Sequence, residues 1–141
     1  MIRRAILPLF FLLAGAGLVS AQVAVIANKT APDDTLSRAK LFDFYSGEKK
    51  FWSNKVPVVV YDLKPVGETK RAFYKLLGKT PSRMKSIWLK KLLMGESDPP
   101  VALISEEEML KKVAVTPGAI GFVSDAKLTR EVKIIIILEK K

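Results

Sequence analysis

Apolar runs of strand length alternate with segments of helical periodicity over most of this chain, and that alternation restricts its possible folds more than any other feature. The runs that predict strands span residues 23–27, 56–61, 101–104, 120–123 and 132–138. The segments that predict helices span residues 36–45, 68–77, 81–94 and 106–113. Such an alternation favours an α/β sandwich around a mostly parallel sheet.

Some elements carry more specific expectations. A polar loop containing Pro32 is predicted from residue 30 up to the cap of the first helix, which Gly47 should end in a left-handed conformation. Phe51 and Trp52 are expected to pack the returning chain back onto that helix. The run 132–138, VKIIIIL, is nearly all apolar, which is typical of a strand that is central or covered on both faces.

The N-terminal residues are typical of a secretory signal peptide. Arg3 and Arg4 precede an apolar run over residues 5–19, and residues 19–21, VSA, fit the pattern that export peptidases accept. The run is shorter than the roughly 20 residues that a membrane span requires. We therefore predict a signal peptide at 1–21, cleavage after Ala21, and one periplasmic domain at 22–141 with no stable membrane insertion.

The chain is basic and has neither histidine nor cysteine. It carries 24 Lys and Arg against 14 Asp and Glu, a formal net charge of +10. In an exported protein this excess favours small anions, acidic envelope surfaces or an acidic partner protein, and not nucleic acid. Without histidine or cysteine, the commonest zinc, Cys-His and Ser-His centres are excluded. We expect no catalytic residues, no metal site and no cofactor.

The stretch YDLKPVGETKRAFY, residues 61–74, is the strongest candidate for a ligand site. In an open α/β sheet, ligands bind outside the carboxyl ends of the strands, where helix N-termini present free N–H groups. A glycine there lets the chain approach a ligand closely, and hydroxyl, ammonium and guanidinium groups add donors for an oxyanion, although a glutamate would repel it. The predicted ligand-binding residues are Gly67, Glu68, Thr69, Lys70 and Arg71.

An ordered series of segments resembles the periplasmic phosphate-binding proteins of ABC importers. The segments are VAVIANK, LSRAKLFDFYSGEKKFWSN, VPVVVYD, ETKRAFYKLLGK, MGESDPP and VTPGAIGFV, which together cover nearly all of residues 23–123. The resemblance implies a single three-layer lobe of the type II periplasmic-binding-protein fold. It further implies a non-enzymatic protein that binds an oxyanion such as phosphate and has an ABC permease as partner.

The chain departs from that family in length and in its binding loops. It is about half as long as the two-lobed members, and residues 65–69, PVGET, stand where the family has a glycine- and serine-rich loop. Only Gly67 and Thr69 carry over to that loop by position.

An alternative function remains open on the sequence. The chain could be an interaction or sensory protein that kept the fold, lost the ligand cleft and binds an acidic partner. Two basic features favour this hypothesis: the turn GEKKF at residues 47–51, and the predicted helix at 82–94 with its side chains Arg83, Lys85, Lys90 and Lys91.

Overall fold

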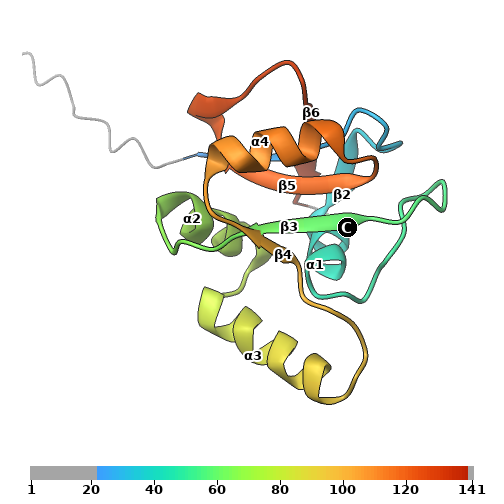
Figure 1. The fold of residues 1–141 in the computed structure, drawn as a ribbon, viewed down its shortest axis with the longest axis vertical. Coiled ribbons are helices and arrows are strands. Elements are labelled where there is room, and N and C mark those ends of the chain that lie inside the picture. Colours follow the sequence, from blue (N-terminus) through green and yellow to red (C-terminus); the bar gives the residue numbers. More distant parts are fainter. Residues whose placement is uncertain (1–21, 140–141) are drawn as a thin grey trace, which may run out of the picture.

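The alternation of strands and helices produces a six-stranded sheet in the order β2-β6-β1-β5-β3-β4 (Figure 1). The computed structural model describes residues 22–139, so the predicted signal peptide at 1–21 lies outside the described residues and stays a prediction. The strands are β1 (Val23–Ala27), β2 (Thr35–Ser37), β3 (Val59–Leu63), β4 (Val101–Leu103), β5 (Ala119–Ser124) and β6 (Lys133–Leu138). The helices are α1 (Arg38–Tyr45), α2 (Glu68–Leu77), α3 (Pro81–Leu93), α4 (Glu106–Val115) and the short 3-10 helix η1 (Asp125–Lys127).

The sheet is mostly parallel, as the sequence predicts. Strand β6 runs parallel to β2, and β3 runs parallel to both β4 and β5. The central strand β1 is the exception, because it pairs antiparallel with both β5 and β6. Strand β2 occupies the end of the segment expected to be a loop, where only pairing with β6 defines it.

Helices cover both faces of the sheet, which confirms the expected three layers. On one face, Phe122 of β5 stacks on Phe73 of α2 with ring centroids 3.9 Å apart, and Tyr45 of α1 packs beside them. On the other face, Gly121 lies so close to α4 that an added Cβ would collide with Sδ of Met109. Alternate residues of β5 therefore serve the two halves of the core.

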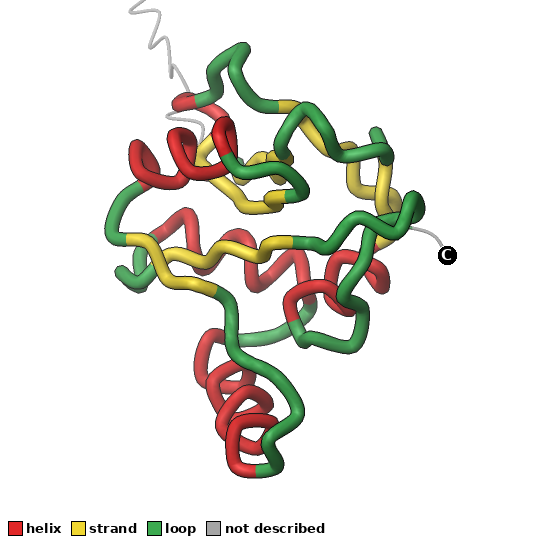
Figure 2. Tube along the Cα trace, turned by 45° about the vertical axis from the view of Figure 1, so that its right-hand side comes forward, coloured by secondary structure: helices red, strands yellow, loops and turns green. Residues whose placement is uncertain are grey.

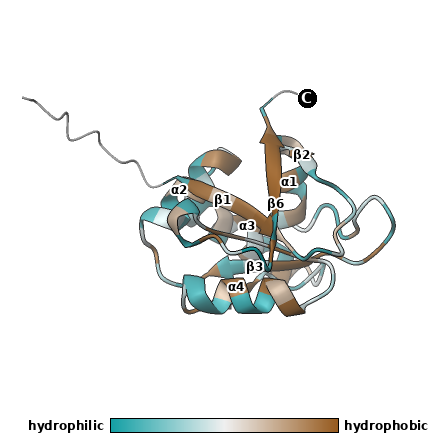
Figure 3. Ribbon diagram, turned by 90° about the horizontal axis from the view of Figure 1, so that it is seen from above, coloured by the Kyte–Doolittle hydropathy of each residue, from teal (hydrophilic) through white to brown (hydrophobic). Residues whose placement is uncertain are grey.

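Strand β6 was expected to be central or covered on both faces, and the first alternative is confirmed: β6 is an inner strand, although only one of its faces is covered. It pairs along both edges, as an inner strand does, and Ile135 is buried. The next residue, Ile136, is 58% exposed, and Ile134 and Leu138 on the same face are also exposed. The reason is that α4 packs over β5 and β3 and does not extend over β6. Figure 3 shows the hydrophobic colour along this strand.

Helix α3 stands apart from the sheet at one end of the long axis (Figures 1 and 2). Trp88 attaches it to the body: its side chain is 9% exposed, and its Nε1 donates to the carbonyl oxygen of Tyr45 at 2.9 Å. Gly47, in the turn that follows α1, has a φ of +76°, and a Cβ added there would come within 2.7 Å of the Trp88 ring. Glycine is thus required for both its conformation and its size. Within residues 22–139, no helix combines the length and apolar character needed to cross a bilayer.

Candidate functional site

The predicted ligand site lies at the carboxyl end of β3, where the starts of two helices meet. Because β3 and β4 are parallel, their carboxyl ends share one edge, and the chain passes from them into α2 and α4. Between these helix starts lies a hollow of about 450 Å³. It is lined by Leu63, Pro65, Gly67, Glu68, Thr69, Lys70, Ile104, Ser105, Glu106, Glu107 and Lys127.

Four of the five predicted residues come together at this hollow, and one does not. Gly67, Glu68, Thr69 and Lys70 all line it. Arg71 instead lines a different hollow, of about 610 Å³, together with Lys75, Lys79 and the start of α3. One residue further along a helix turns the side chain by about 100°, which places Arg71 on the exposed stripe of α2 that also carries Lys75.

The N-terminus of α2 has no side-chain cap. Ser37, Thr80 and Ser105 cap α1, α3 and α4 by accepting hydrogen bonds from backbone N–H groups, whereas Gly67 offers no such oxygen to α2. The first-turn N–H groups of α2 therefore adjoin the hollow without a side-chain acceptor at the cap position. The backbone of Gly67 is extended, and an added Cβ would meet nothing within 4 Å. The glycine is not needed for the fold, and it leaves space beside these amides.

Lys70 is held at the end of β3 and does not point freely into the hollow. Its Nζ donates to the carbonyl oxygen of Leu63 at 2.6 Å and lies 3.7 Å from Oδ2 of Asp62. The Tyr74 hydroxyl donates to the same carboxylate oxygen. Burial, reinforced by the Asp62 carboxylate, raises the pKa of Tyr74 well above its usual value, so this phenol stays neutral. Lys70 contributes positive charge near the site, with its ammonium already partnered.

Carboxylates from α4 line the opposite wall of the hollow. Glu106 accepts a hydrogen bond from the backbone N–H of Ser124, and Glu107 pairs with Lys127 at 2.8 Å. The Lys127 ammonium lowers the pKa of Glu107, and Glu107 raises the pKa of Lys127. Three carboxylates, counting Glu68, line the hollow with two ammonium groups, which leaves one formal negative charge. This excess of one negative charge disfavours the binding of a doubly charged anion.

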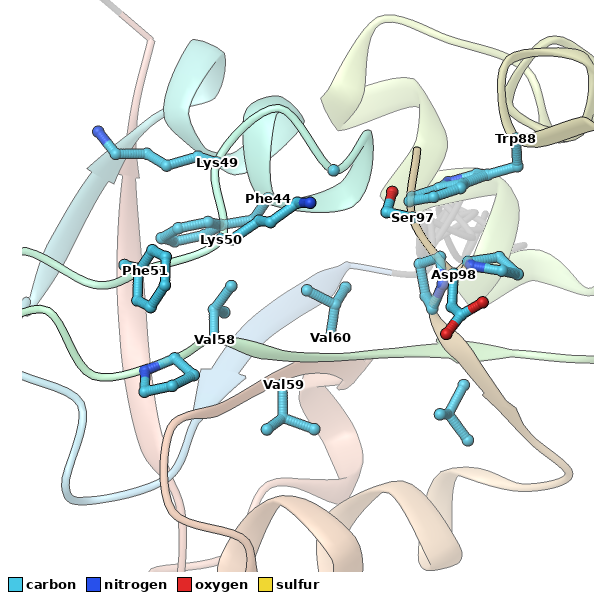
Figure 4. Close-up of a pocket in the computed structure, with 15 residues that line it drawn as sticks. Phe44, Lys49, Lys50, Phe51, Val58, Val59, Val60, Trp88, Ser97 and Asp98 are labelled. Atoms are coloured by element: carbon cyan, nitrogen blue, oxygen red, sulfur yellow. The ribbon is translucent and has the colours of Figure 1, made fainter. Parts of the chain in front are cut away.

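A second hollow, of about 540 Å³, lies towards the amino end of β3 and was not predicted from the sequence. Figure 4 shows Val58 and Val60 pointing into it and Lys50 extending over it, while Val59 points to the other face of the strand. Prolines have no N–H for a strand ladder, so β4 begins only after residues 99–100, and the start of β3 is left without a partner on the β4 side. The paired prolines are the sequence signal that could have revealed it. Its largely apolar lining suits an apolar group better than free phosphate.

Among the described residues, no group of three or more acidic side chains is arranged to hold a metal ion. The arrangement at the carboxyl end of β3 offers a ligand two kinds of hydrogen-bonding interaction. Backbone N–H groups at the start of α2 and the Thr69 hydroxyl can donate hydrogen bonds. Glu68 can accept one from a protonated ligand oxygen.

Comparison with solved structures shows that this chain has a known fold. No family model and no curated protein matches the sequence. A putative phosphate ABC transporter substrate-binding protein with bound phosphate from Clostridium perfringens superposes with a TM-score of 0.67 at 18% identity, over 82% of this chain and 44% of that one. An ABC-type phosphate transport receptor from Vibrio cholerae superposes with a TM-score of 0.64 at 20% identity, over 82% and 45% of the two chains.

A possible phosphate binding protein from Planctomyces limnophilus gives a TM-score of 0.61 at 14% identity, over 83% of this chain and 41% of that one. At such identities the likeness shows the fold alone. The chain has the fold of a single lobe similar to part of the ABC phosphate-transporter substrate-binding proteins, and it spans less than half of their length. These neighbours are a phosphate transport receptor, a putative transporter substrate-binding protein and a possible phosphate binding protein.

Proposed function

We propose that this chain is an exported, non-enzymatic binding protein that holds a tetrahedral oxyanion, phosphate in preference to sulfate, at the N-terminus of α2. One observation carries the proposal: the helix start beside Gly67 has no side-chain cap and adjoins a hollow at the carboxyl end of β3. Helix N-termini bind anions through their free N–H groups and the positive end of the helix dipole. The phosphate-binding neighbours with the same fold support this choice of ligand.

The charge around the hollow sets the expected affinity and selectivity. Its carboxylates outnumber its ammonium groups by one, and a single lobe leaves the ligand open to solvent on one side. We therefore expect a dissociation constant nearer millimolar than micromolar, which corresponds to roughly 4 to 6 kcal/mol. Glu68 repels a fully ionised ligand but accepts a hydrogen bond from a protonated phosphate oxygen, which favours phosphate over sulfate.

The variant Gly67→Asp tests the proposal directly. The new carboxylate should cap α2 and raise the free energy of unfolding by a few tenths to about 1 kcal/mol, because Gly67 has open space around it and no strained conformation. The same carboxylate should abolish phosphate binding by occupying the N–H groups and repelling the anion. Titration calorimetry with phosphate at constant ionic strength measures the loss.

Ser82→Asp is the matched control, because it adds the same charge near the start of α3, where Thr80 already caps the helix. It should leave phosphate binding unchanged. Phosphate affinity that survives in Gly67→Asp would contradict the proposed site.

Export is proposed on the sequence of residues 1–21. A periplasmic protein cleaved after Ala21 has an intact mass that corresponds to a chain beginning at Gln22, and a retained Met1 would contradict it. An ABC permease is the partner that the fold suggests, because the neighbours belong to ABC transport systems. The alternative, an acidic partner, is favoured by one observation: the protruding helix α3 has the exposed basic side chains Arg83, Lys85 and Lys90.

A further inference from the structure

Helix α3 is apolar on two sides, and only one of them is covered by the described residues. Met84 and Trp88 are buried against the body of the molecule. Leu89 and Leu93 are exposed on the far side of the helix, and Leu92 and Met94 are exposed at its C-terminal end; we call these four side chains the outer face. Leu93 is 81% exposed. Exposed apolar side chains clustered within six residues are typical of a docking surface and unusual for a purely solvated helix.

The charged side chains of helix α3 itself are all basic, while Glu48 and Glu96 line an adjoining hollow with Arg83, Lys90 and Met94. Helix α3 contains no acidic residue, and its basic residues are Arg83, Lys85, Lys90 and Lys91. Lys91 is occupied by Glu48 at 2.7 Å, and the other three are exposed. At about 100° per residue, Lys85 flanks Leu89 and Leu93 on one side, and Arg83 and Lys90 flank them on the other. Because Glu48 is paired with Lys91, the three exposed basic groups outnumber the remaining carboxylate of Glu96, and a complementary surface is apolar at its centre with a net negative charge around it.

The position of α3 favours a broad, flat occupant. Both views place the helix at one end of the molecule, beyond the sheet and the other helices, with its C-terminal end furthest from the body (Figures 1 and 2). A planar surface can reach this projecting end without meeting the sheet. A second copy of the same helix is disfavoured, because the basic flanks would repel one another.

We propose that the outer face of α3 docks on an anionic phospholipid bilayer. The leucines enter the boundary between headgroups and acyl chains, and Arg83, Lys85 and Lys90 pair with lipid phosphates. An apolar stripe flanked by basic residues is the arrangement that holds a helix in a membrane interface, where apolar burial and attraction to anionic lipids add. This docking is independent of the oxyanion site proposed on α2.

A local probe distinguishes this contact from any other route to the membrane. Since the chain has no cysteine, Leu93→Cys in the full chain can carry a single polarity-sensitive fluorophore. Ile136→Cys is the matched control, because Ile136 is also exposed and apolar but lies on β6. We expect a blue shift of the label at position 93 with phosphatidylglycerol–phosphatidylethanolamine vesicles and none with phosphatidylcholine vesicles. The emission of the label at position 136 should not shift with either kind of vesicle.

Two results with the label would overturn the proposal. Equal responses from both labelled positions indicate non-specific adsorption. Sedimentation of the protein with anionic vesicles while the label at position 93 stays silent indicates binding through another segment, such as residues before 22. An absence of any binding to anionic vesicles also overturns membrane docking and leaves a protein as the occupant.

Unlabelled variants separate the apolar and charged contributions. Leu89→Ser with Leu93→Ser should reduce the vesicle-bound partition coefficient by about tenfold or more, because two apolar side chains no longer enter the interface. Each of Lys85→Gln and Lys90→Gln should reduce it by about fivefold, less so at high salt. Ile136→Ser should leave the partition coefficient unchanged. Thermal melts verify that all variants fold, and vesicle binding by the double leucine variant equal to the parent's would contradict the proposal.

Discussion

Trp88 shows how one residue joins a projecting helix to the rest of the molecule. Its ring lies against Gly47, its Nε1 donates to the Tyr45 carbonyl, and the side chain is almost fully buried. The helical periodicity of residues 81–94 predicted the helix that carries Trp88. The hydrogen bond to Tyr45 could not be predicted, because it depends on where α3 meets the end of α1.

We predict that Trp88→Ala lowers the free energy of unfolding by about 3 to 5 kcal/mol, because it creates a cavity and leaves the buried Tyr45 carbonyl oxygen without its donor. Denaturant melts measure this change, and Leu93→Ala on the exposed side of the same helix is the control, with a change of less than about 0.5 kcal/mol. A loss below about 1 kcal/mol for Trp88→Ala would show that α3 is not packed as described.

The buried phenols determine how stability responds to alkaline pH. Burial, with a contribution from the Asp62 carboxylate, raises the pKa of Tyr74 and of Tyr45 above the ordinary value. In the unfolded chain these phenols ionise near pH 10. Above that pH the unfolded state binds fewer protons than the folded state, so the free energy of unfolding falls as pH rises.

We predict that Tyr74→Phe makes this alkaline decrease shallower than in the parent protein, because one of the two phenols with a raised pKa is removed. Denaturant melts over a pH series around and above pH 10 provide the measurement. Identical slopes in parent and variant would mean that Tyr74 titrates normally in the folded protein.

At the scale of the elements, the sequence predicted what local pattern determines and missed what neighbouring elements impose. The helices were anticipated because their apolar stripes and caps lie within each segment. Strand β2 was missed because its three residues carry no strand pattern and are defined by pairing with β6. The apolar run of β6 fitted an inner strand, but such a run does not reveal how far α4 extends over it.

The same distinction between local pattern and neighbouring elements applies to the candidate site. Residues 67–70 line one hollow because a strand-to-helix connection fixes them locally, and their role in ligand binding stays a prediction. Arg71 was grouped with them by adjacency, although helical periodicity aligns it with Lys75. The carboxylates of Glu106 and Glu107 reach the hollow from α4, some forty residues further along the chain. No local pattern could have predicted that opposing wall.

Neighbouring positions on β6 test the one-sided cover. Ile135 points into the core beside Val25, and Ile136 points to the uncovered face. We predict that Ile135→Ala lowers the free energy of unfolding by about 2 to 5 kcal/mol, whereas Ile136→Ala lowers it by less than about 1 kcal/mol. Urea melts of the two variants give the comparison. Equal losses would mean that β6 is covered on both faces.

At the scale of the whole molecule, the chain has a single lobe where the phosphate-binding neighbours have more than twice the aligned length. This lobe has a six-stranded sheet, helices on both faces and a strand-to-helix connection at Gly67. A ligand at the N-terminus of α2 would therefore have one protein wall and solvent opposite. Weak and selective oxyanion binding is the central claim of this account.

Amide NMR with phosphate, at constant ionic strength, tests that claim most directly. We predict saturable shifts of the amides of residues 67–70, with a dissociation constant near millimolar. We further predict weaker shifts of the same amides with sulfate, and no saturable shifts of these amides with chloride. Shifts that miss these amides, or that are the same and diffuse for phosphate, sulfate and chloride, would contradict oxyanion binding at α2.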